Sequence, residues 1–244
     1  MSSLTKMLNV LDLFTPEHPS WTIEEMAEHL GYAVPTMYRY AKELNNAGLL
    51  RHSSGARYVL GTRIIELDYQ IRNIDPLIQA SSQAMRSLAE KSGSDVVLGT
   101  IYADRIITVS HAFGEENLKI SFVRGKRMPL FKGALSKCVL STLSKPQLRK
   151  VMADNTGEFA GLEAQTIHEQ LKEIRKKGYW ATFSELNQGV VGIAIPYQNK
   201  QHQINASLGF IVSDKRYSLM EEGKAVAELQ NCAEEIDFAL RHYG

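Results

Sequence analysis

The beginning of the chain carries short apolar stripes with helical spacing, and each stripe ends at a residue that stops a helix. Apolar side chains recur at this spacing over residues 5–14 and predict a first helix that ends before Pro16. Thr22, followed three residues later by Glu25, has the pattern of a capping box and predicts a second helix that ends at Gly31. The chain is therefore predicted to open with two short helices.

A third helix is predicted within the stretch GYAVPTMYRYAKELNNAGLL, which has a proline near its start and a glycine near its end. Met37, Ala41 and Leu44 are spaced four and then three residues apart, so they form the buried stripe of this helix. Tyr38 and Trp21 are also predicted to be core residues. The residues predicted to face outward are Pro35, Thr36, Arg39, Tyr40 and Glu43.

A hairpin is predicted directly after the third helix. Residues 49–52 and 57–60 are short β-rich runs on either side of SSGA, a turn that contains glycine. The order of helix, helix, turn, helix and hairpin is typical of a winged helix-turn-helix domain. In such a domain the second of the paired helices enters the major groove of DNA, and the wing lies along the phosphate backbone.

Charge counted by segment supports this interpretation. The whole chain has a net charge of +1, which is not the basic signature of a nucleic-acid binder. However, residues 1–31 carry one lysine against five acidic residues, whereas residues 32–60 carry four basic residues against Glu43 alone. An ordinary solvated helix face with one arginine and one lysine is the alternative explanation, and the complete order of elements weighs against it.

The rest of the chain has a different pattern. Residues 62–73 predict a helical connector, and Asp75 with Pro76 begins a helix that reaches about Lys91 and ends at Gly93. The order of the later elements predicts one mixed, largely antiparallel sheet with helices packed on it. These elements are strands in DVVLGTIY, RIITVSHAF and LKISFV, helices at residues 133–143 and after the caps Ser144 and Thr166, strands in YWATF, VVGIAIPY and INASLGFIV, and a final helix over residues 219–243.

Three segments of the chain resemble a known family. They are GYAVPTMYRYAKELNNAGLL, RMPLFKGALSKCVLSTL and TFSELNQGVVGIAIPY, and the last is similar to a Glu-x-x-x-Gly-Val-x-x-Ile-Ala-x-Pro signature. The chain resembles an IclR-type bacterial transcriptional regulator over nearly its whole length. It departs from the family at Val34-Pro35, where Lys-Ser is usual, and at Phe131-Lys132, where a histidine and a small residue are usual.

The resemblance implies an α+β chain with an N-terminal winged helix-turn-helix, a linker helix and a C-terminal domain of GAF-like fold. The predicted boundaries are 1–61 for the DNA-binding domain, 62–75 for the linker helix and 76–244 for the effector-binding domain. The composition, 44% hydrophobic and 23% charged, suits a globular protein. No apolar run approaches the roughly 20 residues that cross a bilayer. We therefore expect a cytoplasmic protein with no membrane partner.

The outward face of the third helix and the wing carry groups that suit double-stranded DNA. Arg39 is the predicted base reader, because a guanidinium group can donate two hydrogen bonds to guanine. Polar and basic side chains on or beside the wing are predicted to contact phosphates, which add affinity without sequence information. The predicted DNA-binding residues are Thr36, Arg39, Tyr40, Arg51, Ser54 and Arg57.

An effector site is predicted at Lys132–Ala134, just before and at the start of a helix. Unpaired N–H groups and the helix dipole favour a negative group there, and Gly133 lets a ligand come close. Gly192 similarly opens the facing strand. These features suit a small organic carboxylate, and the resemblance extends the class to aromatic acids. Thr182 and Ser213 have an alternative role as ordinary strand residues. The predicted effector-binding residues are Leu98, Met128, Leu130, Lys132, Gly133, Ala134, Thr182, Phe183, Val191, Gly192, Ile211 and Ser213.

Two residues are of types that could take part in catalysis. Cys138 could be a nucleophile and Glu185 could form an acid/base pair with a histidine. However, Cys138 falls in the middle of a predicted helix, where a buried thiol is commoner than a reactive one. Glu185 belongs to the signature loop as a ligand gate or a structural cap. The histidines and the two cysteines show no metal-ligand spacing. We therefore predict no enzyme activity, no metal and no cofactor.

Together these features predict a ligand-responsive transcriptional regulator whose effector is a small organic acid, and the resemblance implies that it acts on a catabolic operon, as a repressor. A single winged domain reads few base pairs, so specificity needs a homodimer on a pseudo-palindromic operator. The first helix and the linker helix are the predicted dimer contacts, and the resemblance implies that effector domains can also pair into a tetramer. A small-molecule-binding or catalytic protein with an incidental helix-turn-helix is the alternative. Only the regulator predicts steeply salt-dependent DNA binding.

Overall fold

The computed structural model describes residues 2–116, 118, 122–158 and 163–243. The chain divides into two compact units, residues 1–75 and 76–244, and the linker helix is part of the first. None of the helices in the described ranges is long and apolar enough to span a bilayer.

The first unit is a small helical domain with a two-stranded wing. Val10, Met37 and Leu50 are among the residues of its single core. The predicted capping box is confirmed, because the Thr22 side chain accepts from the N–H of Glu25 and the Glu25 carboxylate accepts from the N–H of Thr22. The elements are α1 (Ser3–Leu8), the 3₁₀ helix η1 (Asn9–Leu13), α2 (Ile23–Leu30), α3 (Val34–Asn46), β1 (Leu50–His52), β2 (Tyr58–Leu60) and α4 (Arg63–Ile74).

The helix predicted over residues 5–14 is broken into α1 and η1. The tighter 3₁₀ geometry turns both Val10 and Leu13 into the core. It also leaves the Leu13 carbonyl free to accept a hydrogen bond from Trp21 Nε1 at 2.9 Å. Trp21, predicted as a core residue, is half-buried and packs against the same core.

Two sequence predictions about α3 are wrong. Tyr40 does not face outward: it is 5% exposed, lies in the core, and its hydroxyl is 3.0 Å from Ser3 Oγ. Tyr38, predicted to be buried, is 57% exposed. Helix geometry explains both, because Tyr40 lies one turn from Met37 and one turn from Leu44, whereas Tyr38 projects from the opposite face.

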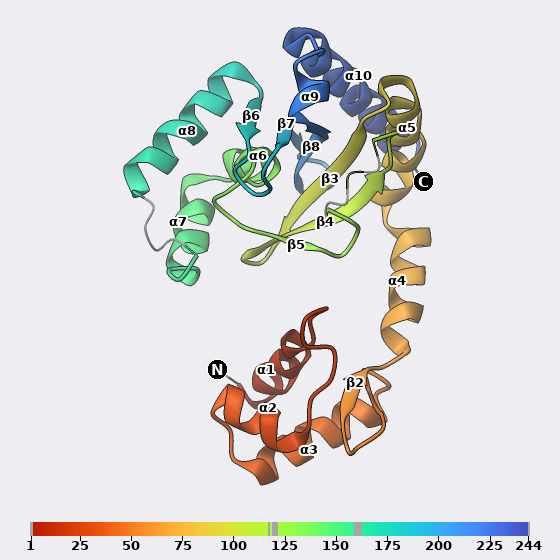
Figure 1. Ribbon diagram of the computed structural model, residues 1–244, viewed down its shortest axis with the longest axis vertical. Coiled ribbons are helices and arrows are strands. Elements are labelled where there is room, and N and C mark those ends of the chain that lie inside the picture. The colour runs from red at the N-terminus through yellow and green to blue at the C-terminus, as the bar shows by residue number, and fades with distance from the viewer. Residues whose placement is uncertain (1, 117, 119–121, 159–162, 244) are drawn as a thin grey trace. The chain divides into compact units, whose positions relative to one another are not determined.

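The second unit is a six-stranded sheet with helices on both faces (Figure 1). The strand order is β5-β4-β3-β8-β7-β6, and the paired strands are antiparallel. This confirms the predicted α+β class. The strands are β3 (Asp95–Tyr102), β4 (Arg105–Ala112), β5 (Arg127–Met128), β6 (Trp180–Phe183), β7 (Val190–Asn199) and β8 (Ile204–Ser213), and the helices are α5 (Pro76–Ser92), α6 (Ala134–Thr142), α7 (Lys145–Asp154), α8 (Ala164–Lys177), α9 (Asp214–Tyr217) and α10 (Glu222–Arg241).

Strands β3, β8 and β7 are buried on both faces, so alternate side chains belong to two cores. Leu98 and Ile193 face α5 and α10. Val97 and Ala194, one residue away in each strand, face α6 and α8. The strands therefore read as nearly continuous apolar runs, and the sequence pattern alone does not show which residues share a face.

Three predicted elements of this unit differ from the structure. Helix α8 begins at Ala164, so Thr166 lies in its first turn instead of capping it. The final helix is preceded by the short helix α9 and begins at Glu222. Of the strand predicted over residues 118–123, residues 119–121 lie outside the described ranges and the described remainder is not in a strand. The strand that pairs with β4 at this edge is β5.

Gly209→Ala tests the pairing of β7 with β8. A Cβ atom at position 209 would lie 2.5 Å from the Ile193 carbonyl oxygen and 2.8 Å from Ala194 Cβ, so the two strands would have to separate. We expect the free energy of unfolding to fall by about 1–3 kcal/mol in urea titrations. Gly223→Ala, in the first turn of α10 with no atom near its added methyl group, is the control and should be neutral or stabilising. Equal stability of the two variants would contradict the assigned register.

Candidate effector pocket and DNA-binding surface

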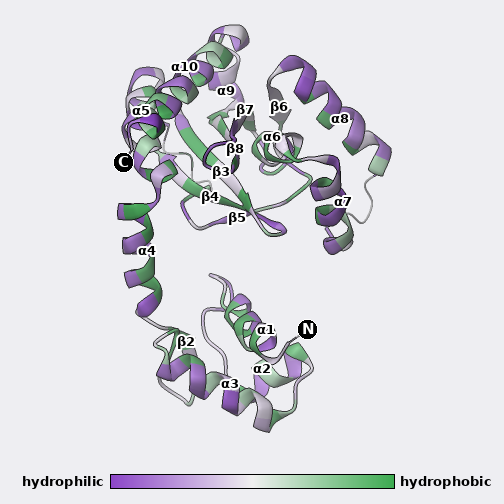
Figure 2. Ribbon diagram, turned by 180° about the vertical axis from the view of Figure 1, so that it is seen from behind, coloured by the Kyte–Doolittle hydropathy of each residue, from purple (hydrophilic) through white to green (hydrophobic). Residues whose placement is uncertain are grey.

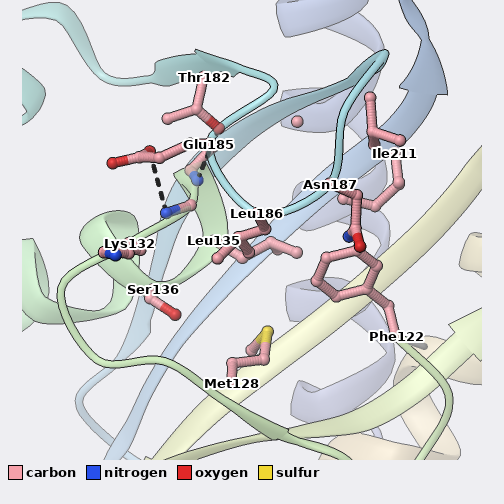
Figure 3. A pocket seen from close by; sticks show the side chains of 14 residues that line it. Phe122, Met128, Lys132, Leu135, Ser136, Thr182, Glu185, Leu186, Asn187 and Ile211 are labelled. Carbon is pink, nitrogen blue, oxygen red and sulfur yellow. Dashed lines mark hydrogen bonds between the residues drawn. The ribbon is translucent and has the colours of Figure 1, made fainter. Parts of the chain in front are cut away.

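The start of helix α6 is held by side chains from β6 and the loop that follows it. The Gly133 N–H donates to Glu185 Oε2 at 3.0 Å, and the Ala134 N–H donates to Thr182 Oγ1 at 3.2 Å (Figure 3). The other oxygen of Glu185 accepts from Lys137 Nζ at 2.7 Å. Two N–H groups of this helix start therefore already have partners within the chain.

This arrangement changes the predicted carboxylate site. The sequence places a ligand on the N–H groups of Lys132–Ala134, and Glu185 and Thr182 accept from two of these groups. The next N–H groups, those of Leu135 and Ser136, precede the first residue that can donate within the helix. Neither has a hydrogen-bond acceptor among the described residues, and both residues line a pocket. The favourable position for an anion is therefore at Leu135 and Ser136 instead of Lys132–Ala134.

The pocket encloses about 370 Å³ of empty space, part of it open to solvent. Helix α6 and strands β7 and β8 form its walls, and residues 185–187 of the loop after β6 lie across it (Figure 3). Seven of the predicted effector residues line the pocket: Met128, Lys132, Gly133, Ala134, Thr182, Gly192 and Ile211.

Three predicted effector residues are buried away from the pocket. Leu98 and Val191 belong to the core beside α5 and α10, on the face opposite the pocket. Because side chains alternate along a strand, Val191 and its neighbour Gly192 cannot both face the ligand. Leu130 is fully buried in the core on the α6 side and does not line the pocket.

Two further predicted effector residues do not line the pocket and make structural contacts instead. Phe183 is 59% exposed, and its ring packs edge to face against Tyr217. Ser213 caps α9 by accepting from the N–H of Arg216, and its hydroxyl donates to Glu116 Oε1 at 2.5 Å. The alternative of an ordinary structural residue therefore describes Ser213 better than ligand contact does.

Sequence reasoning missed half of the pocket lining. The loop after β6 contributes three residues, and it has no periodicity that could show where its side chains point. Positive φ at Ser184 and Gly189 turns this loop over the pocket. The two α6 residues could have been found, because they occupy the next positions of the predicted helix start. The lining residues outside the predicted effector set are Phe122, Leu135, Ser136, Glu185, Leu186, Asn187 and Val190, and of these only Glu185 was predicted to have a role, as a ligand gate or a structural cap.

Cys138, the candidate nucleophile, is a packing residue. It is fully buried, and its thiol donates to the Ala194 carbonyl oxygen at 3.2 Å. Burial raises the pKa of the Cys138 thiol far above its ordinary value, and the thiolate is the reactive form. Across the described ranges, no group of three or more His, Cys, Asp and Glu side chains is placed to hold a metal ion.

Five of the six predicted DNA-binding residues lie exposed or half-buried on α3 and the wing. Arg39 is exposed on α3, with its guanidinium carbon 5.7 Å from the centre of the Tyr40 ring. Thr36 is half-buried on the first turn of the same helix. Arg51 and Ser54 are exposed on the wing. Tyr40 leaves this set because it is a core residue.

The side chain of Arg57 holds the wing against α2. Its two terminal nitrogens donate to the Glu25 carboxylate at 2.8 and 3.2 Å, and it also donates to the hydroxyl and carbonyl oxygens of Ser20. The N–H of Thr22 and the Arg57 guanidinium lower the pKa of Glu25, so its carboxylate stays charged. These partners would compete with a phosphate for the Arg57 guanidinium, and its contact with DNA stays a prediction.

Two protein-family models match the chain. The IclR helix-turn-helix domain matches residues 3–54, and the bacterial transcriptional regulator IclR C-terminal domain matches residues 71–238. The chain belongs to the IclR family. The matches place α3 of this IclR-family protein in a DNA-binding module and the pocket in the C-terminal regulatory module.

Known relatives of this IclR-family protein resemble it over its full length. The HTH-type transcriptional regulator KdgR of Escherichia coli K12 is 22% identical, and the match covers 100% of this chain and 94% of KdgR. An IclR-family regulator from Brucella abortus has a TM-score of 0.83 at 19% identity, covering 98% of this chain and 92% of that one. An IclR homolog complexed with 4-hydroxybenzoate, from Microbacterium hydrocarbonoxydans, has a TM-score of 0.76 at 17% identity, covering 99% and 100%. These matches are to transcriptional regulators and not to enzymes.

Proposed function

We propose that this IclR-family protein represses a catabolic operon and responds to a small organic acid. It binds a pseudo-palindromic operator as a homodimer, and the acid binds in the pocket at the start of α6. The observation that carries the proposal is the pair of N–H groups at Leu135 and Ser136, which lack acceptors among the described residues and belong to residues that line a pocket.

The DNA contacts follow from the exposed faces of α3 and the wing. Arg39 projects from the helix that enters the major groove in this type of domain, and among the described residues it forms no ion pair that would compete with a base. Arg51 and Ser54 on the wing reach phosphates, which fix the register of the protein on DNA. Thr36 adds a hydroxyl beside Arg39.

The homodimer is supported by apolar side chains that the first unit leaves exposed. Ile65 and Tyr69 are four residues apart on one face of α4, and Leu4 and Leu8 repeat this spacing on α1. None of the residues of α4 is buried, and hydrophobic and hydrophilic segments alternate along it (Figure 2). Exposed apolar surface of this kind is typical of an interface. A second copy that covers it would bring two recognition helices to one operator, and pairing of effector domains would extend the dimer to a tetramer.

The acid is supported by the chemistry of the pocket. The carboxylate would accept from the N–H groups of Leu135 and Ser136, and Lys132 would add a positive charge at the same end. Phe122, Met128 and Ile211 line the rest of the pocket with apolar surface, which suits an aliphatic or aromatic body. The relative bound to 4-hydroxybenzoate shows that this fold accommodates an aromatic acid in another family member.

Arg39→Ala tests the DNA surface. A duplex enriched from a random-sequence library serves as the operator, and a scrambled duplex serves as the non-specific reference. We expect a loss of about 1–3 kcal/mol on the operator, a smaller loss on the scrambled duplex, and unchanged thermal unfolding. Arg86→Ala, an exposed arginine on α5, is the matched control and should leave both affinities unchanged. An equal loss on both duplexes would show that Arg39 contacts phosphates instead of bases.

Gly192→Val tests the pocket. The test ligand is the small carboxylate that stabilises the protein most in a thermal-shift screen. Such a screen can detect binding because a ligand at 100 times its Kd stabilises a protein by about 2.7 kcal/mol. A Cβ at position 192 would lie 3.5–3.6 Å from Thr182, Ala134 and Ile211, so the variant should fold while its methyl groups fill the pocket. Gly133 is less suitable because its φ of 83° strains any side chain.

We expect the affinity of Gly192→Val for this carboxylate to fall about tenfold or more in calorimetry. Without the carboxylate, the variant should bind the operator with the affinity of the parent protein. Gly223→Ala controls for the loss of a glycine elsewhere in the same unit. Unchanged affinity of Gly192→Val for the carboxylate would place the effector outside this pocket. A screen in which no carboxylate binds, together with salt-insensitive DNA binding, would contradict the proposed function as a whole.

A further inference from the structure

A row of hydroxyl groups crosses the sheet next to the pocket. Gly99 of β3 pairs with Thr108 of β4 on one side and with Ser207 of β8 on the other. Residues directly opposite each other in neighbouring strands project to the same face of the sheet. Val97, two residues before Gly99, shows that this is the face covered by α6. The two hydroxyls therefore flank a position at which the central strand has no side chain.

Both hydroxyl groups are buried without hydrogen-bond partners. Thr108 and Ser207 are each 0% exposed, and neither Thr108 Oγ1 nor Ser207 Oγ has a partner among the described residues. An unpaired buried hydroxyl destabilises a fold, so two of them at one register position need an explanation. Ser207 Oγ lies 3.5 Å from the point where a Cβ atom of Gly99 would be, so a group above Gly99 would be within its reach.

Met128 separates this row from the pocket. Its terminal methyl group lies so close to Gly99 that a Cβ atom there would overlap it, and the same side chain lines the pocket (Figure 3). Methionine is unbranched and has three rotatable side-chain bonds, so it can change rotamer with little cost to its surroundings. Rotation of Met128 would join the space above Gly99 to the pocket.

We propose that Thr108 and Ser207 form a second polar subsite of the effector pocket, which Met128 covers until a ligand enters. The inference rests on the proposed function, because the other end of the ligand is the acid bound at α6. The ligand class is a hydroxy acid: its carboxylate binds the start of α6 and its distal hydroxyl lies above Gly99. The serine and threonine hydroxyls can each donate or accept, so one accepts the ligand proton while the other donates to the ligand oxygen.

The subsite excludes acids that carry a second charge. A carboxylate above Gly99 would be buried between two neutral hydroxyls, which compensate poorly for lost hydration of an ion. An acid with a plain hydrocarbon end would leave both hydroxyls unpaired. The pocket is therefore selective for a distal hydroxyl over both a methyl group and a second carboxylate.

Matched ligands test this selectivity by calorimetry. Hexanoate, 6-hydroxyhexanoate and adipate differ at the distal end alone, and phenylacetate with 4-hydroxyphenylacetate is an aromatic pair. We expect the hydroxylated member of at least one series to bind about tenfold or more tightly than its partners. Thr108→Val and Ser207→Ala should remove this preference and leave the affinity for the plain acid unchanged. Ser81→Ala, a buried serine of α5 whose hydroxyl donates to Ile78 O, is the control and should keep it.

A neutral probe tests the subsite without the acid. In protein labelled with ¹³C at the methionine methyl groups, phenol should shift the Met128 resonance saturably and toluene should not. This response should be lost in Thr108→Val and Ser207→Ala, and Met128→Leu assigns the resonance. Acids that bind with no preference for a hydroxyl would overturn the subsite and leave the proposed function intact. A Met128 response to phenol without binding of any acid would support the subsite and overturn the proposed acid effector. The absence of both responses would overturn both.

Discussion

The antiparallel register of β3, β8 and β7 determines which side chains meet which helices. These strands are covered on both faces, so a shift of one residue would exchange the two cores. In the observed register Ile193 packs toward α5 and α10, whereas Gly192 and Ala194 face α6. Two small side chains in succession on that face let the helix begin close to β7 and leave space above Gly192. The pocket lies beside this position, at the start of α6.

A helix that begins against a sheet has N–H groups removed from water, and these groups need acceptors. The chain supplies two acceptors itself, Thr182 and the carboxylate of Glu185, whose second oxygen is paired with Lys137. An acid on the next two N–H groups would complete the set. The loop after β6 is held by the same helix start through Glu185. Binding of the acid and ordering of this loop would therefore be coupled through one cluster of hydrogen bonds.

Much of the fold could be predicted from local signals, and the failures have specific physical causes. The capping box at Thr22 and the hairpin around SSGA depend on neighbours in sequence, and both are confirmed. Tyr40 was assigned to the wrong face although its spacing from Leu44 places it on the buried stripe. Alternation along β7 shows that Val191 and Gly192 face opposite sides of the sheet. No local signal shows which of them faces α6 or that Glu185 reaches Gly133, because both depend on the pairing of distant segments. The row of Thr108 and Ser207 likewise appears only once β3 lies between β4 and β8.

If one molecule senses an acid and thereby changes its affinity for DNA, the two binding equilibria are linked, and this linkage can be measured directly. The Kd for the operator is measured with and without saturating acid, and the Kd for the acid is measured with and without saturating operator. If the two sites are coupled, both ratios must be equal, and we expect a factor of about 5 to 150. An acid that binds in the pocket while both ratios remain at one would contradict the account, because binding would then occur without regulation.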